Sequence, residues 1–182
     1  MNLPNFISLA RLLSVPVAVW LILESDFAWA FWVFVAAGIS DGIDGYIAKH
    51  FDQRTRLGAL LDPIADKSLL VAVYITLGIA GHLPAWLVIL VVFRDFLIIG
   101  GFLLVNAMAH AMRSEPLAIS KVNTVLQIGL AAVTLGRLGL GIDAGFMTRA
   151  LIYIVAASTV ISGGGYLVRW TRALAGLEQT SQ

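Results

Sequence analysis

Four regularly spaced aspartates are the residues of this chain best suited to do chemistry: Asp41, Asp44, Asp62 and Asp66. They are four of only eleven acidic residues, and they lie in one short stretch beside long apolar segments. A carboxylate close to hydrocarbon is costly unless it has a partner or a function. On helices, the i, i+3 and i, i+4 spacings place each pair on one face. Two such faces opposite each other would form a four-carboxylate cage, which suits hard divalent cations such as Mg²⁺ or Mn²⁺.

The composition predicts that an integral membrane protein carries these carboxylates. Of the 182 residues, 59% are hydrophobic and 13% are charged, which is more apolar surface than a soluble domain of this size can bury. A net charge of +1 argues against nucleic acid as a partner. The absence of cysteine excludes disulfides and thiolate chemistry. The first residues lack the basic region and cleavage site of a signal peptide, so we expect them to be retained.

Six apolar segments are long enough to cross a membrane as helices, which takes about 20 residues each. The sequence has no β pattern, so we expect an all-α bundle of six transmembrane helices, forming a single domain over residues 1–182. Polar or glycine-rich connections separate the segments. The predicted spans are residues 6–23, 27–48, 57–80, 84–108, 118–138 and 146–170.

Lysine and arginine residues predict the orientation of this bundle, because cytoplasmic ends carry an excess of them. With the N-terminus inside, the outer ends and loops contain only Arg137 and Arg149. Both termini and all four aspartates then lie on the cytoplasmic side of a bacterial inner membrane, or on the equivalent side of a mitochondrial-type one. Arg94 and Asp95 fall well inside the fourth span, where we expect a local pair or a pocket.

The aspartates belong to a longer motif, which reads Asp41-x₂-Asp44-Gly45-x₂-Ala48-Lys49-x₈-Gly58-x₃-Asp62-x₃-Asp66. It resembles the signature of the CDP-alcohol phosphatidyltransferases, D-x₂-D-G-x₂-A-R-x₈-G-x₃-D-x₃-D, and departs from it at Lys49, where the family usually has arginine. The likeness extends to the opening segment Leu3-Pro4-Asn5-x₂-Ser8-x₂-Arg11. A later segment, Ile119 to Gln127, resembles the CMP-forming cardiolipin synthases within the branch that also contains the phosphatidylglycerophosphate synthases.

The resemblance implies transfer of a phosphatidyl group from CDP-diacylglycerol to an alcohol, with release of CMP. It implies a two-metal site of Mg²⁺ or Mn²⁺ held by Asp41, Asp44 and Asp62, with Asp41 and Asp62 bridging the ions. Asp66 would complete the second site and act as general base on the incoming hydroxyl. The residues expected to bind CDP-diacylglycerol are Asn5, Ser8, Arg11, Gly45, Ala48, Lys49 and Gly58.

Three cations, Arg94, Arg113 and Lys121, are candidates for binding the acceptor's phosphate, although Arg113 is equally well explained as a topology signal. The likeness around Ser120 to Gln127 predicts phosphatidylglycerol as acceptor and cardiolipin as product. The alternative acceptor is glycerol-3-phosphate, which gives phosphatidylglycerophosphate. The resemblance also implies a homodimer.

An alternative of another class is a metal-ion transporter, since intramembrane acids also mark ion pathways. It would need polar groups that continue across the bundle, whereas the third span runs on as Leu69-Leu70-Val71-Ala72-Val73. The three histidines, His50, His82 and His110, fall at predicted loops without ligand spacing, and we expect them to be solvated.

Overall fold

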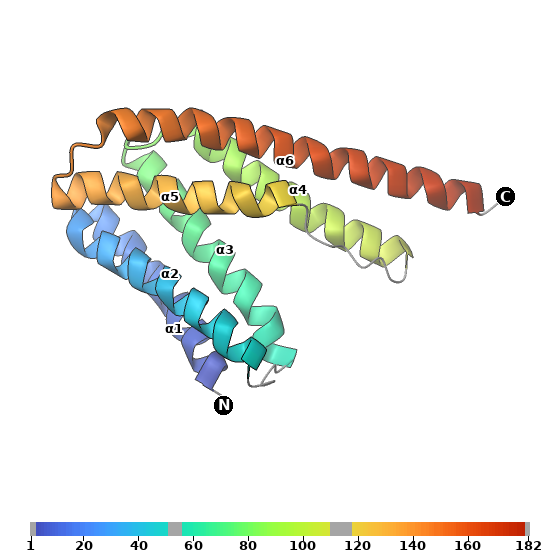
Figure 1. The fold of residues 1–182 in the computed structure, drawn as a ribbon, viewed down its shortest axis with the longest axis horizontal. Helices are drawn as coiled ribbons and strands as arrows, with labels where there is room; N and C mark the ends of the chain where they lie inside the picture. The colour runs from blue at the N-terminus through green and yellow to red at the C-terminus, as the bar shows by residue number, and fades with distance from the viewer. Residues whose placement is uncertain (1–2, 51–55, 110–117, 181–182) are drawn as a thin grey trace.

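The computed structural model describes the chain at residues 3–50, 56–109 and 118–180, and its side chains at residues 9–40, 67–101 and 118–171. All the secondary structure in these ranges is α-helical (Figure 1). Each predicted span corresponds to one helix. The helices are α1 (Leu3–Leu23), α2 (Phe27–His50), α3 (Arg56–Ile79), α4 (Ala85–Ala109), α5 (Ala118–Leu140) and α6 (Gly145–Thr180).

The last helix differs most from its predicted bounds, because α6 continues to Thr180 whereas the predicted span ends at residue 170. The added segment contains Ala173, Leu174, Ala175 and Glu178, which are strong helix formers. The end of an apolar run therefore marks the end of a span and not the end of a helix. Among the described residues, Ala118–Leu140 and Gly145–Thr171 are long and apolar enough to cross a membrane. The six-span arrangement and the cytoplasmic termini stay predictions.

The first and third helices end in the same kind of cap. After α3, the amide of Gly81 donates to the carbonyl of Gly78 and that of His82 donates to the carbonyl of Leu77, with Gly81 at a φ of 78°. These are the two bonds of a Schellman motif, which needs a left-handed residue. After α1, Ser25 takes this place at a φ of 63°. The predicted turn between the third and fourth spans is thereby confirmed.

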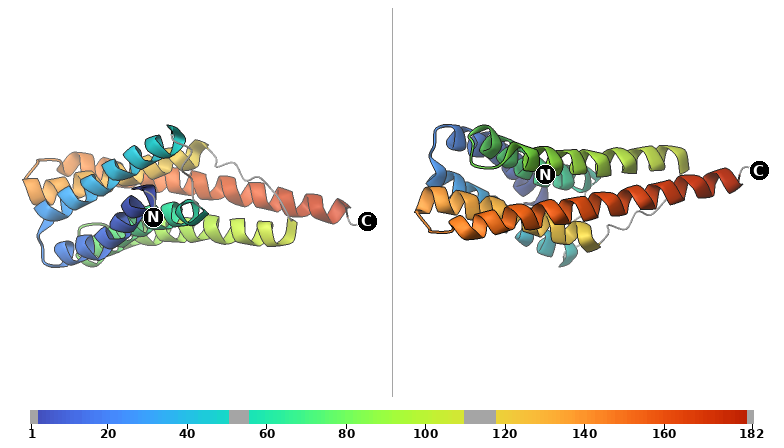
Figure 2. Two further views of the ribbon diagram at one scale, coloured as in Figure 1. Left: turned by 90° about the horizontal axis from the view of Figure 1, so that it is seen from below. Right: turned by 90° about the horizontal axis from the view of Figure 1, so that it is seen from above.

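The helices form two sets that meet at one end of the molecule. In the first set, α1 packs against both α2 and α3, and in the second, α6 packs against both α4 and α5 (Figures 1 and 2). The two sets are joined by α5 on α2 and by α3 on α4 and α5. Three short connections, at residues 24–26, 80–84 and 141–144, lie at what we call the turn end. The end of α2 and the beginnings of α1 and α3 lie together at the opposite, aspartate end (Figure 1).

Toward the turn end, the described side chains form a well-buried apolar core. The core there includes fully buried residues of α3, α4 and α5, namely Leu77, Leu87, Val91, Leu130 and Leu135. Helix α5 approaches α2 so closely that a β-carbon on Gly139 would collide with the backbone of Ala28. Glycine is required at this crossing because no side chain fits.

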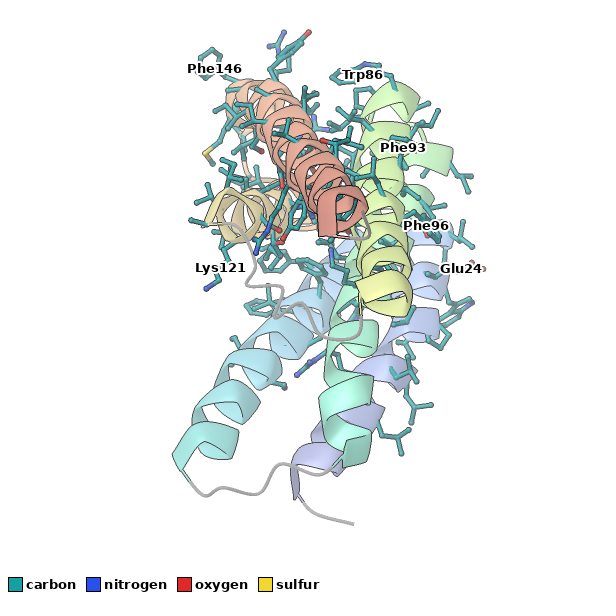
Figure 3. All side chains as sticks on the ribbon, turned by 90° about the vertical axis from the view of Figure 1, so that its right-hand side faces the viewer. Glu24, Trp86, Phe93, Phe96, Lys121 and Phe146 are labelled. Atoms are coloured by element: carbon teal, nitrogen blue, oxygen red, sulfur yellow. The ribbon has the colours of Figure 1, made fainter. Side chains whose placement is uncertain are left out.

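The outer surface of the bundle is apolar. Trp86, Phe93, Phe96 and Phe146 project outward from α4 and α6 (Figure 3), and each of these side chains is roughly half exposed or more. Large exposed apolar surfaces of this kind are typical of proteins that face lipid or a partner. His82 departs from its prediction: it is half-buried, with its ring packed edge-on against Phe27 at a centroid separation of 4.9 Å.

Candidate active site

The four aspartates lie on helices, as their spacing predicts. Asp41 and Asp44 fall within α2, and Asp62 and Asp66 fall within α3. The parts of α2 and α3 that carry them lie at the aspartate end, beside the beginning of α1 (Figure 1). Their side chains lie outside those that the structure describes, so the cage itself stays a prediction.

The predicted divalent metal site would draw its ligands from α2 and α3. Each helix supplies two carboxylates one turn apart, and all the predicted ligand atoms are oxygens, which Mg²⁺ and Mn²⁺ prefer. The side chains described elsewhere in the bundle contain no other group of three or more acidic or histidine residues that could hold a metal. The four aspartates stay the predicted ligands of such an ion.

The candidate residues for binding CDP-diacylglycerol also fall at or near the aspartate end. Arg11, on α1, is 3% exposed and lies between α1 and α2, where it lines a small hollow with Ser14 and Ser40. A buried guanidinium beside the segment that leads into Asp41 is well placed to balance negative charge. The remaining candidates lie within helices but outside the described side chains: Asn5, Ser8, Gly45, Ala48, Lys49 and Gly58.

A second hollow, which we call the lateral hollow, opens between α1, α2, α3 and α5. It has a volume of about 310 Å³ and is lined largely by apolar side chains, including Phe34, Ile39, Leu69 and Ile128. Arg11 is its one charged lining residue among the described side chains. Among the described side chains, the lining includes Ile39 of α2 and Leu69 of α3, which are two and three residues from Asp41 and Asp66. The lateral hollow thus has apolar surface near the aspartate segments.

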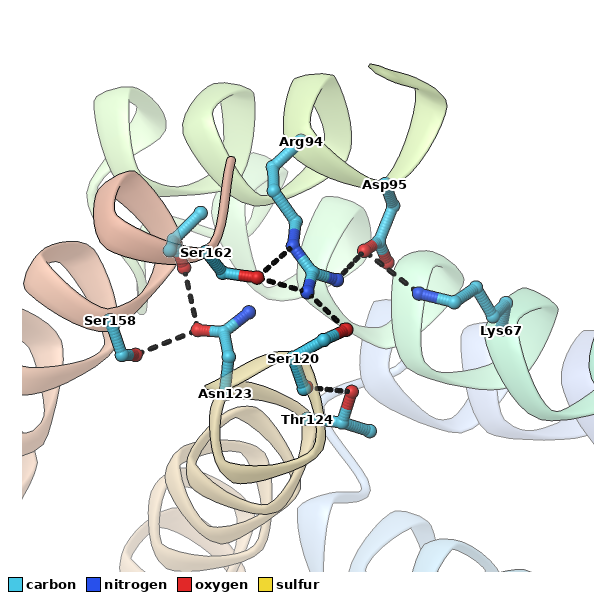
Figure 4. A network of polar contacts seen from close by, with 9 residues as sticks. Lys67, Arg94, Asp95, Ser120, Asn123, Thr124, Ser158 and Ser162 are labelled. Atoms are coloured by element: carbon cyan, nitrogen blue, oxygen red, sulfur yellow. Dashed lines mark hydrogen bonds and ion pairs between the residues drawn. The ribbon is translucent and has the colours of Figure 1, made fainter. Parts of the chain in front are cut away.

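A buried charge network begins at Lys67, the residue after Asp66. Lys67 Nζ lies 2.8 Å from Asp95 Oδ1, and Arg94 Nη1 donates to the same oxygen over 2.7 Å (Figure 4). Arg94 and Asp95 are 2% and 3% exposed. Buried charges are tolerated when they are paired and hydrogen-bonded, and this pairing confirms the predicted local pair in the fourth span. The network connects α3, just past its aspartates, to α4.

The other donors of Arg94 extend the network to α5 and α6. Its Nη2 donates to Ser120 Oγ over 2.6 Å, and both Nε and Nη2 donate to Ser162 Oγ. One turn farther along α5, Asn123 Oδ1 accepts hydrogen bonds from Ser158 and Thr159 of α6 at 2.7 and 2.9 Å (Figure 4). Four helices are therefore held in register by polar groups.

The candidate acceptor-binding cations have different surroundings. Arg94 is buried and directs its donors to Asp95, Ser120 and Ser162. Lys121 is exposed on the first turns of α5 (Figure 3). Arg113 lies outside the described residues. A role in binding the acceptor stays a prediction for all three.

Sequence reasoning missed the partners of Arg94 and Asp95. Two signals point to these partners: an Arg–Asp pair inside an apolar span needs polar neighbours, and Ser158 and Ser162 are spaced i, i+4 in the sixth span, on one helical face.

The sequence that carries the aspartate motif matches a known family. The model of the CDP-alcohol phosphatidyltransferase family matches residues 1–161. The chain belongs to this family. The match covers α1 to α5 and about half of α6, so it includes the aspartate motif, the lateral hollow and most of the polar network.

Three curated relatives of this chain have different enzyme names. A CDP-diacylglycerol–glycerol-3-phosphate 3-phosphatidyltransferase of rice chloroplasts is 34% identical, over 93% of this chain and 57% of the relative. The human cardiolipin synthase (CMP-forming) is 36% identical, over 74% of this chain and 50% of the relative. A protein of Mycobacterium tuberculosis H37Rv named as a probable phosphatidylglycerophosphate synthase is 30% identical, over 99% of this chain and 87% of the relative.

The chain thus spans about half the length of the rice and human proteins and most of the mycobacterial one. These relatives are named as enzymes that use two different acceptors. The comparisons therefore support the family and leave both acceptor readings open.

Proposed function

We propose that this chain is a metal-dependent, membrane-embedded CDP-alcohol phosphatidyltransferase that transfers a phosphatidyl group from CDP-diacylglycerol to phosphatidylglycerol, giving cardiolipin and CMP. The observation that carries the proposal is the placement of two aspartate pairs, each with its members one turn apart, on the parts of α2 and α3 that lie at the same end of the bundle. Membership of the family supports the same reaction class.

The residues have the following roles in this proposal. Asp41, Asp44 and Asp62 would hold two divalent cations, with Asp66 completing the second site. When bound, such a pair of cations neutralises the pyrophosphate and polarises the attacked phosphoryl group. Arg11 and Lys49 add positive charge around the donor. Lys49 does so as a point charge, without the two-pronged geometry of arginine.

Bond making and breaking balance within the two substrates. The acceptor's hydroxyl oxygen forms a bond to the phosphorus that carries diacylglycerol, and the bond from that phosphorus to the oxygen of CMP breaks. CMP leaves with the electron pair, and the hydroxyl proton passes to Asp66 as general base.

Two features favour a lipid acceptor. The lateral hollow offers apolar surface directly beside the aspartate segments, where acyl chains of donor and acceptor would pack. The half-buried Lys67, which follows Asp66, and the buried Arg94 both form ion pairs with Asp95. Fewer cations are then available for a dianionic acceptor.

The alternative acceptor, glycerol-3-phosphate, has support of its own. The relatives from rice and M. tuberculosis carry names of the enzymes that make phosphatidylglycerophosphate. Lys121 is exposed near the beginning of α5, where it is accessible to a water-soluble phosphate.

We extend the proposal to the membrane. Six helices would span a bacterial inner membrane, or one of mitochondrial type, with both termini and the aspartate end on the cytoplasmic side, and two copies would form a homodimer. The apolar outer surface supports the embedding. A metal-ion transporter is disfavoured, because α3 continues past Lys67 with buried apolar residues such as Leu69, Leu70 and Val73.

The test is release of CMP by purified protein from CDP-diacylglycerol, with Mg²⁺ or Mn²⁺ and one acceptor at a time. Product mass identifies the acceptor. We expect cardiolipin from phosphatidylglycerol, and no turnover after chelation of the metal. Turnover with glycerol-3-phosphate alone would replace the proposed acceptor by the alternative one. Metal flux into proteoliposomes without CMP release would favour the transporter.

A further inference from the structure

A polar hollow lies at the turn end, far from the aspartates. It has a volume of about 420 Å³, and its lining includes His82, Pro84, Arg137, Thr148, Arg149 and Ile152. These residues come from the α3–α4 turn, the end of α5 and the beginning of α6. We call it the turn-end hollow. The reaction proposed above makes no use of it.

Among the described side chains, the charged residues that line the turn-end hollow are both arginines. Arg137 and Arg149 are the two cations that the orientation analysis places on the outer side, and the fold brings both to this one hollow. No acidic residue is among those that line it. Glu24, Asp26 and Asp143 lie at the same end and are exposed, and the ion pairs of the described side chains do not include either arginine.

The guanidinium donors of Arg137 and Arg149 are available to bind another group. Arg137 Nε is buried and has no hydrogen-bond partner, and Arg149 Nε reaches only the carbonyl of Gly145 on its own helix, at 3.4 Å. The positive charge of Arg137 also acts on His82. Burial, and to a smaller extent the charge of Arg137, lower the pKa of its imidazole. Buried donors without partners cost free energy, which an anionic ligand would recover.

The surroundings of the turn-end hollow are those of a membrane interface. Trp86 and Tyr153 are within two residues of the lining residues Pro84 and Ile152, their ring centroids are 6.3 Å apart, and both are about half exposed or more. Tryptophan and tyrosine are enriched where headgroups meet hydrocarbon. A ligand with a phosphate at the arginines and an apolar portion over these rings fits the whole region, whereas free phosphate would use the arginines alone.

We propose that the turn-end hollow binds the phosphodiester of an anionic phospholipid from the outer leaflet, opposite the active site. Arg137 and Arg149 would donate to the phosphate oxygens, and the acyl chains would pack along α4 and α6. The proposal rests on the membrane embedding proposed above, and it is independent of the reaction and its acceptor.

Native mass spectrometry of the purified protein, given phosphatidylglycerol and phosphatidylcholine in equal amounts, tests this. We expect the double variant Arg137→Gln/Arg149→Gln to lose one phosphatidylglycerol adduct, with occupancy about tenfold lower. Any lipid bound at the aspartate end is common to both proteins and cancels in the comparison. Equal retention of phosphatidylglycerol by the double variant and the original protein would overturn the proposal.

Two further variants serve as controls for this experiment. Arg149→Gln changes an exposed side chain, so it keeps the test valid if the double variant unfolds, and it should lower occupancy several-fold. Asp143→Asn removes a charge at the same end without altering the hollow's lining, and it should retain the adduct. Displacement of the adduct by millimolar inorganic phosphate would overturn the lipid assignment in favour of a phosphate site. CMP release, measured on the same samples, reports separately on the proposed reaction.

Discussion

The two ends of the bundle are constructed differently. At the turn end, three short connections close the helix pairs, the core is fully buried, and α5 meets α2 at a glycine that admits no side chain. At the aspartate end lie the end of α2 and the beginnings of α1 and α3, and the sequence there is rich in carboxylates and cations. The first end sets the position of the helices, and we propose that the second uses that position for chemistry.

The polar network between the two ends explains how the packing at the turn end can position the helices at the aspartate end. Lys67 follows Asp66 directly, and its contact with Asp95 couples the aspartate-bearing turn of α3 to α4, α5 and α6. Apolar packing is tolerant of small shifts, whereas hydrogen bonds from a guanidinium fix direction as well as distance. We infer that the network helps to keep these four helices in register beside the aspartate-bearing turn.

The largest effect is expected at the aspartate end. Replacing Asp66 by asparagine removes the proposed general base and one metal ligand, and it should lower the turnover number by about 10³-fold, as loss of a general base does. The melting temperature in detergent should stay the same. Asp143→Asn, at the turn end, is the matched control and should keep full turnover. Near-normal turnover by Asp66→Asn would show that this aspartate is not the base.

A smaller effect is expected from the network. Asp95→Asn leaves Lys67 and the buried Arg94 without their shared counter-charge, and removing one partner of a buried pair costs about 3 kcal/mol of stability. Thermal unfolding in one detergent measures this against Asp26→Asn, which changes an exposed acid. Equal stability of the two variants would mean that the network contributes little to holding the helices.

The smallest effect is expected at the turn end, from a single methyl group. In Gly139→Ala the β-carbon would collide with the backbone of Ala28, and overpacking of this kind costs about 2 kcal/mol. Gly129→Ala, on the same helix, meets nothing within 4 Å and should be neutral or slightly stabilising. Comparison of the two melting temperatures tests the close approach. A Gly139→Ala protein as stable as Gly129→Ala would contradict it.

Most of the helical architecture could be predicted from the sequence because local signals specify it. Apolar runs of about 20 residues gave six helices, and Gly81, Pro84 and Gly141 lie at the turns where such residues are favoured. The aspartate spacing gave the helical placement of both pairs. The predicted sixth span agrees with the apolar segment Gly145–Thr171, and α6 continues past it to Thr180 because hydropathy defines a membrane span whereas helix propensity defines the end of a helix.

The tertiary partners could not be read in the same way. That Lys67 and Arg94 share Asp95, or that Arg137 and Arg149 line one hollow, depends on which helices pack together, and the six-helix pattern admits several arrangements. The pair Arg94–Asp95 was predicted because its members are adjacent in sequence. Ser120 and Ser162, which are 26 and 68 residues from Arg94, became visible only in the fold.

The length of α6 makes the tilt of this helix measurable. A helix of 36 residues is about 54 Å long at 1.5 Å per residue, whereas the hydrocarbon layer is about 30 Å thick. If α6 begins at the outer surface, its last turns extend past the opposite headgroups as a straight stalk. A fluorophore placed at Thr180 would then stand clear of the bilayer on the same side as the aspartates, and its distance from dye-labelled lipids would read out the tilt of α6 directly.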